Sequence, residues 1–148
     1  MHIEMATPGD IPALSDLLSA LFSQEAEFTP NPEAQAKGLG RIIGNPEMGA
    51  VFVARGDGKV VGMVNLLFTV STALGEKVAL LEDMVVLSHA RGAGVGSQLL
   101  DRAILFARAQ GCKRITLLTD RANESAQRFY RKKGFVVSSM VTMRLPLA

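Results

Sequence analysis

The chain has 148 residues, of which 48% are apolar, 20% charged and 5% aromatic. This length and composition fit one globular domain over residues 1–148 with a full hydrophobic core, and they exclude disordered, collagen-like and disulfide-scaffold proteins. Sixteen basic and fourteen acidic side chains give a formal charge of +2. Because this charge is nearly balanced, no nucleic-acid partner is expected.

Cysteine and histidine are scarce. Cys112 is the single cysteine, and the only histidines are His2 and His89, so an internal disulfide is excluded and no metal site is expected. The N-terminus lacks a basic segment leading into an apolar one, and no apolar run approaches the roughly 18 residues of a membrane span. These features predict a cytoplasmic protein that does not enter a membrane.

The first half of the chain alternates helical and strand-like periodicity. Apolar residues at helical spacing follow Asp10, which is placed to cap a helix, and Gly56-Asp57-Gly58-Lys59 has the chemistry of a hairpin turn. The predicted elements are a strand over 1–6, a helix over 11–24, a weaker helix ending near 44, and a hairpin of 51–54 with 60–68.

The second half repeats a strand–helix alternation. The predicted elements are a strand over 80–87, a helix from about 95 to 111, a strand over 115–118, a helix over 123–133, and one or two closing strands within 135–145. No repeat or long linker divides the chain. This order predicts one mixed α/β domain, with a right-handed crossover between the strands at 80–87 and 115–118.

A glycine-rich segment, Arg91-Gly92-Ala93-Gly94-Val95-Gly96-Ser97, precedes the third predicted helix. Its three glycines carry no β-carbon to keep an anion away from the backbone, and a helix start adds unpaired N–H groups. The surrounding charge agrees, because residues 91–133 hold ten basic and three acidic side chains. The segment is predicted to hold a pyrophosphate, although glycines at such a turn also serve purely steric needs.

Two common nucleotide-binding patterns fit this segment poorly. A Walker loop needs Gly-Lys-Ser/Thr, whereas Gly96-Ser97-Gln98 has no lysine. A dinucleotide fingerprint needs a third glycine where Ser97 stands, and it follows the first strand rather than lying in mid-chain. Both interpretations become minor alternatives.

Two motifs in register resemble the GNAT superfamily of acetyl-CoA-dependent N-acetyltransferases. The signature Arg/Gln-x-x-Gly-x-Gly/Ala is matched by Arg91, Gly94 and Gly96. The second signature is an Asn, an Ala, an aromatic-Tyr pair and a Gly-Phe pair, and residues 123–135 match it. The resemblance covers essentially the whole chain. It implies a mostly antiparallel sheet, splayed between the strands at 80–87 and 115–119, with about four flanking helices.

The resemblance also implies roles for the matching residues, with acetyl-CoA as the acyl-donor cosubstrate. Backbone groups of Met84 and Val86 would pair with the pantetheine arm like an added strand. Asn123 would hydrogen-bond the pantetheine side, and Tyr130 would lie near the thioester sulfur. The N–H groups that would hold the pyrophosphate belong to Gly92, Ala93, Gly94, Val95, Gly96 and Ser97.

The chemistry of acetyl transfer supports these roles. Coenzyme A leaves as a thiolate, and the phenol of Tyr130, the only tyrosine, can donate a proton or hydrogen bond to it. The alternative for Tyr130 is a core aromatic that packs beside Phe129 and Phe135. The alternative for Asn123 is a helix N-cap, which is compatible with binding the cofactor.

An attacking amine is protonated at neutral pH, so the site needs a base or a water path to one. Glu82 and Asp83 are the candidates, because acidic residues are out of place in an otherwise apolar strand. Strand alternation predicts that they lie on opposite faces, with Glu82 on the face of Met84 and Val86. Glu82 is favoured as base or acceptor ligand, while Asp83 and water remain alternatives.

The first functional hypothesis is therefore a small cytoplasmic enzyme that transfers an acetyl group directly from acetyl-CoA to a primary amine. The alternative is a non-catalytic acyl-CoA-binding regulatory module, which needs neither Tyr130 nor a carboxylate. The acceptor is not specified by any motif; its specificity is expected in the first two helices and the loop at 71–78. A homodimer is one expected assembly, because dimers are common among relatives.

Overall fold

The computed structural model describes residues 1–25 and 27–148. The chain forms two compact units, Met1–Leu118 and Thr119–Ala148. The first unit holds the sheet and three helices: β1 (His2–Met5), α1 (Ile11–Phe22), α2 (Pro32–Ile43), β2 (Gly49–Gly56), β3 (Lys59–Ser71), β4 (Glu76–Val86), α3 (Val95–Ala109) and β5 (Ile115–Leu117). The second unit holds α4 (Glu124–Lys132).

The strands form one sheet in the order β1-β2-β3-β4-β5. The first four strands are antiparallel, and β5 is parallel to β4, as a crossover through α3 requires. The pairing of β4 with β5 covers only Ala79 to Leu81. Because β4 continues to Val86, its last residues leave this edge free of any strand in the described part of the chain. The expected mixed, mostly antiparallel and splayed sheet is confirmed, and the described residues contain the four expected α-helices.

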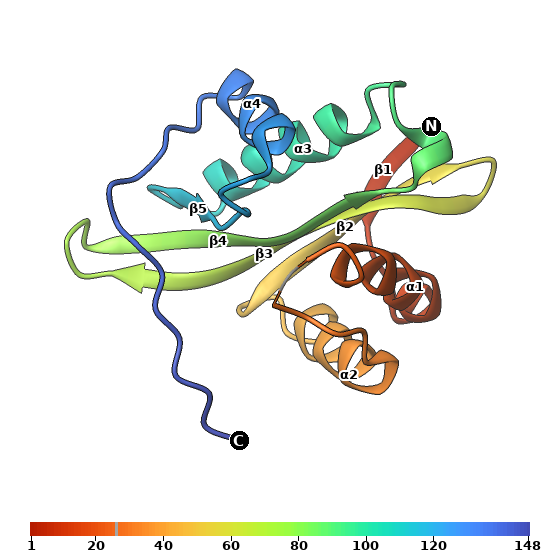
Figure 1. Cartoon of the computed structure of the whole chain (residues 1–148), viewed down its shortest axis with the longest axis horizontal. Coiled ribbons are helices and arrows are strands. Elements are labelled where there is room, and N and C mark those ends of the chain that lie inside the picture. Colours follow the sequence, from red (N-terminus) through yellow and green to blue (C-terminus); the bar gives the residue numbers. More distant parts are fainter. Residues whose placement is uncertain (26) are drawn as a thin grey trace. The chain divides into compact units, whose positions relative to one another are not determined.

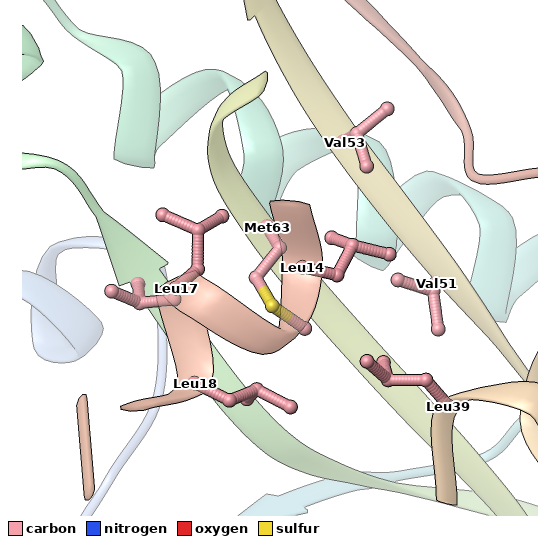
Figure 2. Packing of buried hydrophobic residues seen from close by; sticks show 8 residues of the cluster. Leu14, Leu17, Leu18, Leu39, Val51, Val53 and Met63 are labelled. Atoms are coloured by element: carbon pink, nitrogen blue, oxygen red, sulfur yellow. The ribbon is translucent and has the colours of Figure 1, made fainter. Parts of the chain in front are cut away.

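Helices cover both faces of the sheet in the first unit, with α1 and α2 on one face and α3 on the other (Figure 1). The α1/α2 face has a core built by the leucine spacing of α1 against alternate residues of the strands (Figure 2). Its buried members are Leu14, Leu17, Leu18, Leu39, Val51, Val53, Met63 and Val85. On the other face, Phe52 of β2 meets Phe106 of α3 edge to face at 5.2 Å.

Two segments of the first unit differ from the prediction. β3 continues to Ser71 and β4 starts at Glu76, so the expected loop at 71–78 is mostly a long hairpin with a short turn. Asp10 precedes α1 as expected, but its side chain does not cap that helix. Its carboxylate instead accepts from Thr7 N–H at 2.8 Å and pairs with Arg55 at 2.8 Å.

The second unit does not contain the predicted closing strands. Residues 135–148 form no strand, and their apolar side chains, such as Val136 and Met143, are exposed. The alternation of apolar and polar residues from Val141 to Leu147 resembles that of a strand. A strand also needs a partner for its backbone groups, and this unit contains no other strand.

Candidate active site

The open edge of β4 presents the backbone groups of Met84 and Val86. Leu87 N–H donates to Val61 O at 2.8 Å, so these two residues form a hydrogen-bonded pair of the β3–β4 ladder. Hydrogen-bonded and non-hydrogen-bonded pairs alternate, so Val86 and Met84 direct their N–H and C=O groups away from β3. The two residues predicted to pair with a pantetheine arm therefore offer an unpaired strand edge to a ligand.

Arg91 fixes the turn that follows this edge. Its Nε donates to Val86 O at 3.0 Å, while its own N–H donates to Ser88 O at the end of a short 3-10 turn. The guanidinium thus lies against the outward carbonyl of β4 and brings a positive charge to the start of the glycine segment. A carbonyl has two lone pairs, so Val86 O can still accept from a ligand.

The glycine segment leads into α3 with its backbone exposed. Gly92 and Gly94 have φ angles of +86° and +79°, in the left-handed region that favours glycine. Gly94 is the N-cap of α3, and no described side chain caps the helix. The first N–H groups of the 15-residue helix are therefore available to an anion, at the positive end of its dipole. Val95, Gly96 and Ser97 supply these groups.

A hollow of about 450 Å³ lies beside this segment. Ala93, Val95 and Gln98 line it from the segment and α3, and Gly56 and Asp57 line it from the β2–β3 turn. A hollow of this size accommodates a ligand group next to the free helix end. His89 also lines the hollow and is exposed.

β4 contains a bulge that the sequence did not predict. Met84 pairs with Val64 and Leu81 pairs with Leu66, so two residues of β4, Glu82 and Asp83, stand opposite the single residue Asn65 of β3. Strand alternation does not run through a bulge, and the prediction that Glu82 shares the face of Met84 and Val86 loses its basis.

Asn65 binds Asp83 at the bulge through both ends of its amide. The Asp83 N–H donates to Asn65 Oδ1 at 2.7 Å, and Asn65 Nδ2 donates to Asp83 Oδ2 at 3.1 Å. Asn65 is only 2% exposed. The side chain of Asn65 thus gives the additional backbone N–H of the bulge a partner and holds the carboxylate in one orientation.

The two neighbouring carboxylates have different surroundings. Asp83 is partly buried, and this burial raises its pKa to about 6, with the nearby charges of Glu82 and Glu25 acting in the same direction. The hydrogen bond from Asn65 opposes the rise by stabilising the ionised form. Glu82 is exposed, and within the described residues its side chain makes no hydrogen bond or ion pair.

Tyr130 lies in α4 of the second unit. Its ring centroid is 5.3 Å from that of Phe129 and 5.7 Å from that of Phe135, both in edge-to-face arrangements. Burial raises the pKa of Tyr130 to about 12, so the phenol keeps its proton at neutral pH. In the described residues its hydroxyl group makes no hydrogen bond. Tyr130 therefore packs against Phe129 and Phe135, as the structural alternative predicts, and its hydroxyl remains available as a hydrogen-bond donor.

Asn123 begins the same helix as its N-cap. Its Oδ1 accepts from Ala126 N–H at 3.1 Å and from the Ser125 hydroxyl at 3.2 Å. The structure therefore confirms the helix N-cap alternative for Asn123. Its amide nitrogen makes no hydrogen bond to any described residue and remains a donor for a ligand.

The expected site residues fall into two groups. The first unit brings together Met84, Val86, the 91–97 segment and the two carboxylates, and α4 of the second unit carries Asn123 and Tyr130. Across the described ranges, no cluster of His, Cys, Asp and Glu is suited to a metal, and no helix is long and apolar enough to cross a membrane. Sequence reasoning missed Asn65, although an amide within the apolar run 60–68 was a signal that could have identified it.

Comparisons with known proteins point to one family. The model of the acetyltransferase (GNAT) family matches residues 11–135. An uncharacterized N-acetyltransferase of Bacillus subtilis is 29% identical over 137 residues, which are 91% of this chain and 89% of that protein. The aminoalkylphosphonate N-acetyltransferase of Salmonella typhimurium is 28% identical over 134 residues, covering 90% and 84% of the two chains.

Solved structures agree. A putative acetyltransferase from Agrobacterium tumefaciens has a TM-score of 0.82 and 30% identity, and the alignment covers 98% of this chain and 100% of that one. A crystal structure of a probable acetyltransferase has a TM-score of 0.84 and 26% identity over 100% of this chain and 99% of that one. The fold is therefore shared with these two proteins over nearly the whole length of the chain.

Proposed function

Because the chain belongs to the acetyltransferase (GNAT) family and is an acyltransferase, we propose that it moves the acetyl group of acetyl-CoA directly to a primary amine. The observation that carries this proposal is the pairing of two ligand-binding features within one unit. An open strand edge at Met84 and Val86 is followed, after a short turn, by an uncapped helix N-terminus at Gly94.

These two features fit the chemistry of coenzyme A. The pantetheine arm carries amide groups, which pair with outward N–H and C=O groups as a neighbouring strand does. The pyrophosphate is an anion, and the N–H groups of residues 92–97 with the dipole of α3 favour one. The positive φ angles of Gly92 and Gly94 turn the backbone there without a β-carbon on the exposed side. Asn123 is proposed to donate its amide hydrogens to the pantetheine side.

Tyr130 is proposed as the proton donor to sulfur. Its high pKa keeps the hydroxyl protonated throughout the neutral range, and the Phe129 and Phe135 rings fix the orientation of its ring. Acetyl-CoA supplies the activated acyl group, and no acyl-enzyme is needed. Cys112 is an unsuitable acyl carrier, because burial raises its pKa and keeps it a thiol.

The acceptor is proposed to be a small molecule or peptide with a primary amine. The relative from Salmonella typhimurium is named for aminoalkylphosphonates, so these compounds belong in the first amine panel beside polyamines, amino acids and peptides. We place the activity in the cytoplasm, where reducing conditions keep a lone thiol such as Cys112 free.

Two measurements on one preparation test the proposal. Calorimetry should show saturable binding of acetyl-CoA, and an amine panel should show release of free thiol that depends on the amine. Binding without thiol release from any amine would favour the regulatory binding module. No binding at millimolar acetyl-CoA would contradict the assignment of residues 84–97 as the cradle that holds the cofactor.

A further inference from the structure

We propose that Asp83 takes the proton from the acceptor's ammonium group and that Asn65 is the residue that positions Asp83 for this step. This inference rests on the proposed acetyl transfer and names the base in it. It replaces Glu82, which the sequence favours, by its neighbour.

The bulge in β4 fixes the position of Asp83. Two residues of β4 stand opposite one residue of β3, and both hydrogen-bonding ends of the Asn65 amide are used on Asp83, at 2.7 and 3.1 Å. One bond fixes the backbone and the other fixes the carboxylate, so the orientation of the Asp83 carboxylate is defined before any substrate arrives. Only Oδ2 receives this bond, and among the described residues no partner is seen for Oδ1, which is left for a substrate proton.

The Asp83 carboxylate lies on the α1/α2 face of the sheet. Asn65 pairs across the sheet with Val51, a member of the α1/α2 core, so the side chains of Asn65 and Val51 share that face. The Asp83 carboxylate is hydrogen-bonded to the Asn65 side chain and therefore lies on the same face. The N-terminus of α3 belongs to the helix on the opposite face (Figure 1). The acceptor and the pyrophosphate are thus bound from different sides of β4.

The charges around Asp83 select a cationic acceptor. Its charged neighbours are Glu82, next to it on β4, and Glu25, which follows α1, and both raise its pKa. Asn65 is the polar neighbour from β3. The α1 side chains of the core on this face are apolar: Leu14, Leu17 and Leu18 are buried, and Ile11, Leu21 and Phe22 are partly buried beside them. An ammonium group entering here meets negative charges, which favours primary amines that carry no anionic group close to the nitrogen.

The neighbouring Glu82 lacks these properties. It is exposed, and no described residue orients its carboxylate by a hydrogen bond. A solvated carboxylate without a fixed orientation is a poor general base, whereas the pKa of Asp83, about 6, lies close to the working range of one. In this mechanism Glu82 contributes its negative charge, which raises the pKa of Asp83.

The proton balance of the reaction closes with these residues. Asp83 accepts one proton from the ammonium group and later releases it to water. The amine nitrogen then forms its bond to the acetyl carbon as the carbon–sulfur bond breaks with its electron pair on sulfur. Tyr130 gives its proton to that sulfur, and the second proton of the nitrogen restores the phenol through water. The products are an N-acetylated amine, free coenzyme A and one proton.

The test compares two isosteric variants of adjacent residues, Asp83→Asn and Glu82→Gln, in the pH dependence of kcat/KM for the amine. The parent should lose activity as pH falls through about 6. Asp83→Asn should lower kcat/KM by roughly 10²-fold or more and abolish this acid limb. Glu82→Gln should keep the limb and move it to lower pH, because one negative neighbour of Asp83 is gone. A limb abolished in Glu82→Gln and retained in Asp83→Asn would overturn the proposal.

Asn65 is tested by the position of the same limb. Asn65→Asp keeps an oxygen for the Asp83 N–H, removes the donor to the carboxylate and adds a negative charge, so the limb should move to higher pH. Asn65→Ser, which adds no charge, should move it in the same direction by less and guards against misfolding of the first variant. A reduced rate with an unmoved limb in both would mark Asn65 as merely structural and overturn its positioning role.

Measurements of acetyl-CoA binding distinguish a failure of the Asp83 role from a failure of the proposed function. All four variants should bind acetyl-CoA as the parent does, because the cradle lies in residues 84–97 and uses no atom of the altered side chains. A parent that acetylates an amine with a pH profile unaffected by Asp83→Asn overturns the role of Asp83 and leaves the proposed function standing. A parent that binds acetyl-CoA and acetylates no amine overturns both.

Discussion

Replacing Asp83 by asparagine should stabilise the folded protein at neutral pH while it reduces activity. In the folded protein the pKa of Asp83 is raised from 3.8 to about 6, mainly by burial. Between these two values the unfolded chain ionises and the folded protein holds its proton, so the ionised carboxylate costs folding free energy as pH rises. At 1.36 kcal/mol per pKa unit, the cost reaches ~3 kcal/mol above pH 6.

Urea denaturation of the parent and of Asp83→Asn over a pH series measures this cost. The difference in unfolding free energy should be constant below about pH 4 and should grow by ~3 kcal/mol in favour of the variant as pH rises to 7. Contributions from other carboxylates cancel in the difference. The variant keeps the backbone N–H bond to Asn65, and its new amide oxygen can still accept from the Asn65 side chain. Parallel stability curves for the two proteins across this range would refute the buried, raised-pKa description of Asp83.

Three further predictions follow from other parts of the structure. Gly94→Val should fold with a loss of ~1–2 kcal/mol of stability from its positive φ, and calorimetry should show poor binding of acetyl-CoA. The control Gly111→Val is equally strained, at φ +82° past the other end of α3, and should bind acetyl-CoA normally. Equal binding by both variants would contradict the assignment of the glycine segment to the pyrophosphate. Tyr130→Phe should keep coenzyme A affinity and both ring contacts but lose roughly 10²-fold in turnover in steady-state kinetics, and full activity would exclude the phenol from the mechanism. Arg55→Leu should destabilise the protein at pH 7, because Arg55 pairs with the Asp10 carboxylate and lowers its pKa. In urea denaturation, the difference in unfolding free energy between parent and variant should shrink as pH falls below about 4, since protonation of Asp10 removes this stabilisation. A difference independent of pH would contradict the ion pair.

The parts of the site that depend on local sequence were predictable. The glycine segment needs its residue types in a fixed order before a helix, and the positive φ of Gly92 and Gly94 and the uncapped start of α3 follow from that local chemistry. The same holds for Asn123, whose N-cap geometry is set by its own helix. The open strand edge at Met84 and Val86 was predicted through the family resemblance. The alternation of hydrogen-bonded and non-hydrogen-bonded pairs between β3 and β4 explains why the backbone groups of these two residues point outward.

The bulge could not be predicted, because it is a property of two strands. Alternation along β4 alone assigned Glu82 and Asp83 to opposite faces, and only the register against β3 shows that both stand opposite Asn65. The ends of β3 and β4 have a similar origin. Thr69 to Ser71 has mixed polarity by itself and becomes strand because it pairs with residues 76–78. The strand-like pattern after Phe135 is the converse case, since alternation without a partner in its unit forms no strand.

The reaction that we propose for this protein is direct acetyl transfer from acetyl-CoA to an amine. The most direct measurement incubates the purified protein with carbonyl-labelled ¹³C-acetyl-CoA and the amine that gives the fastest thiol release, then quantifies free thiol and labelled amide by mass spectrometry. We predict one labelled N-acetyl amine for each thiol released, with no label retained on the protein. Thiol release without labelled amide, or label left on the protein, would contradict it.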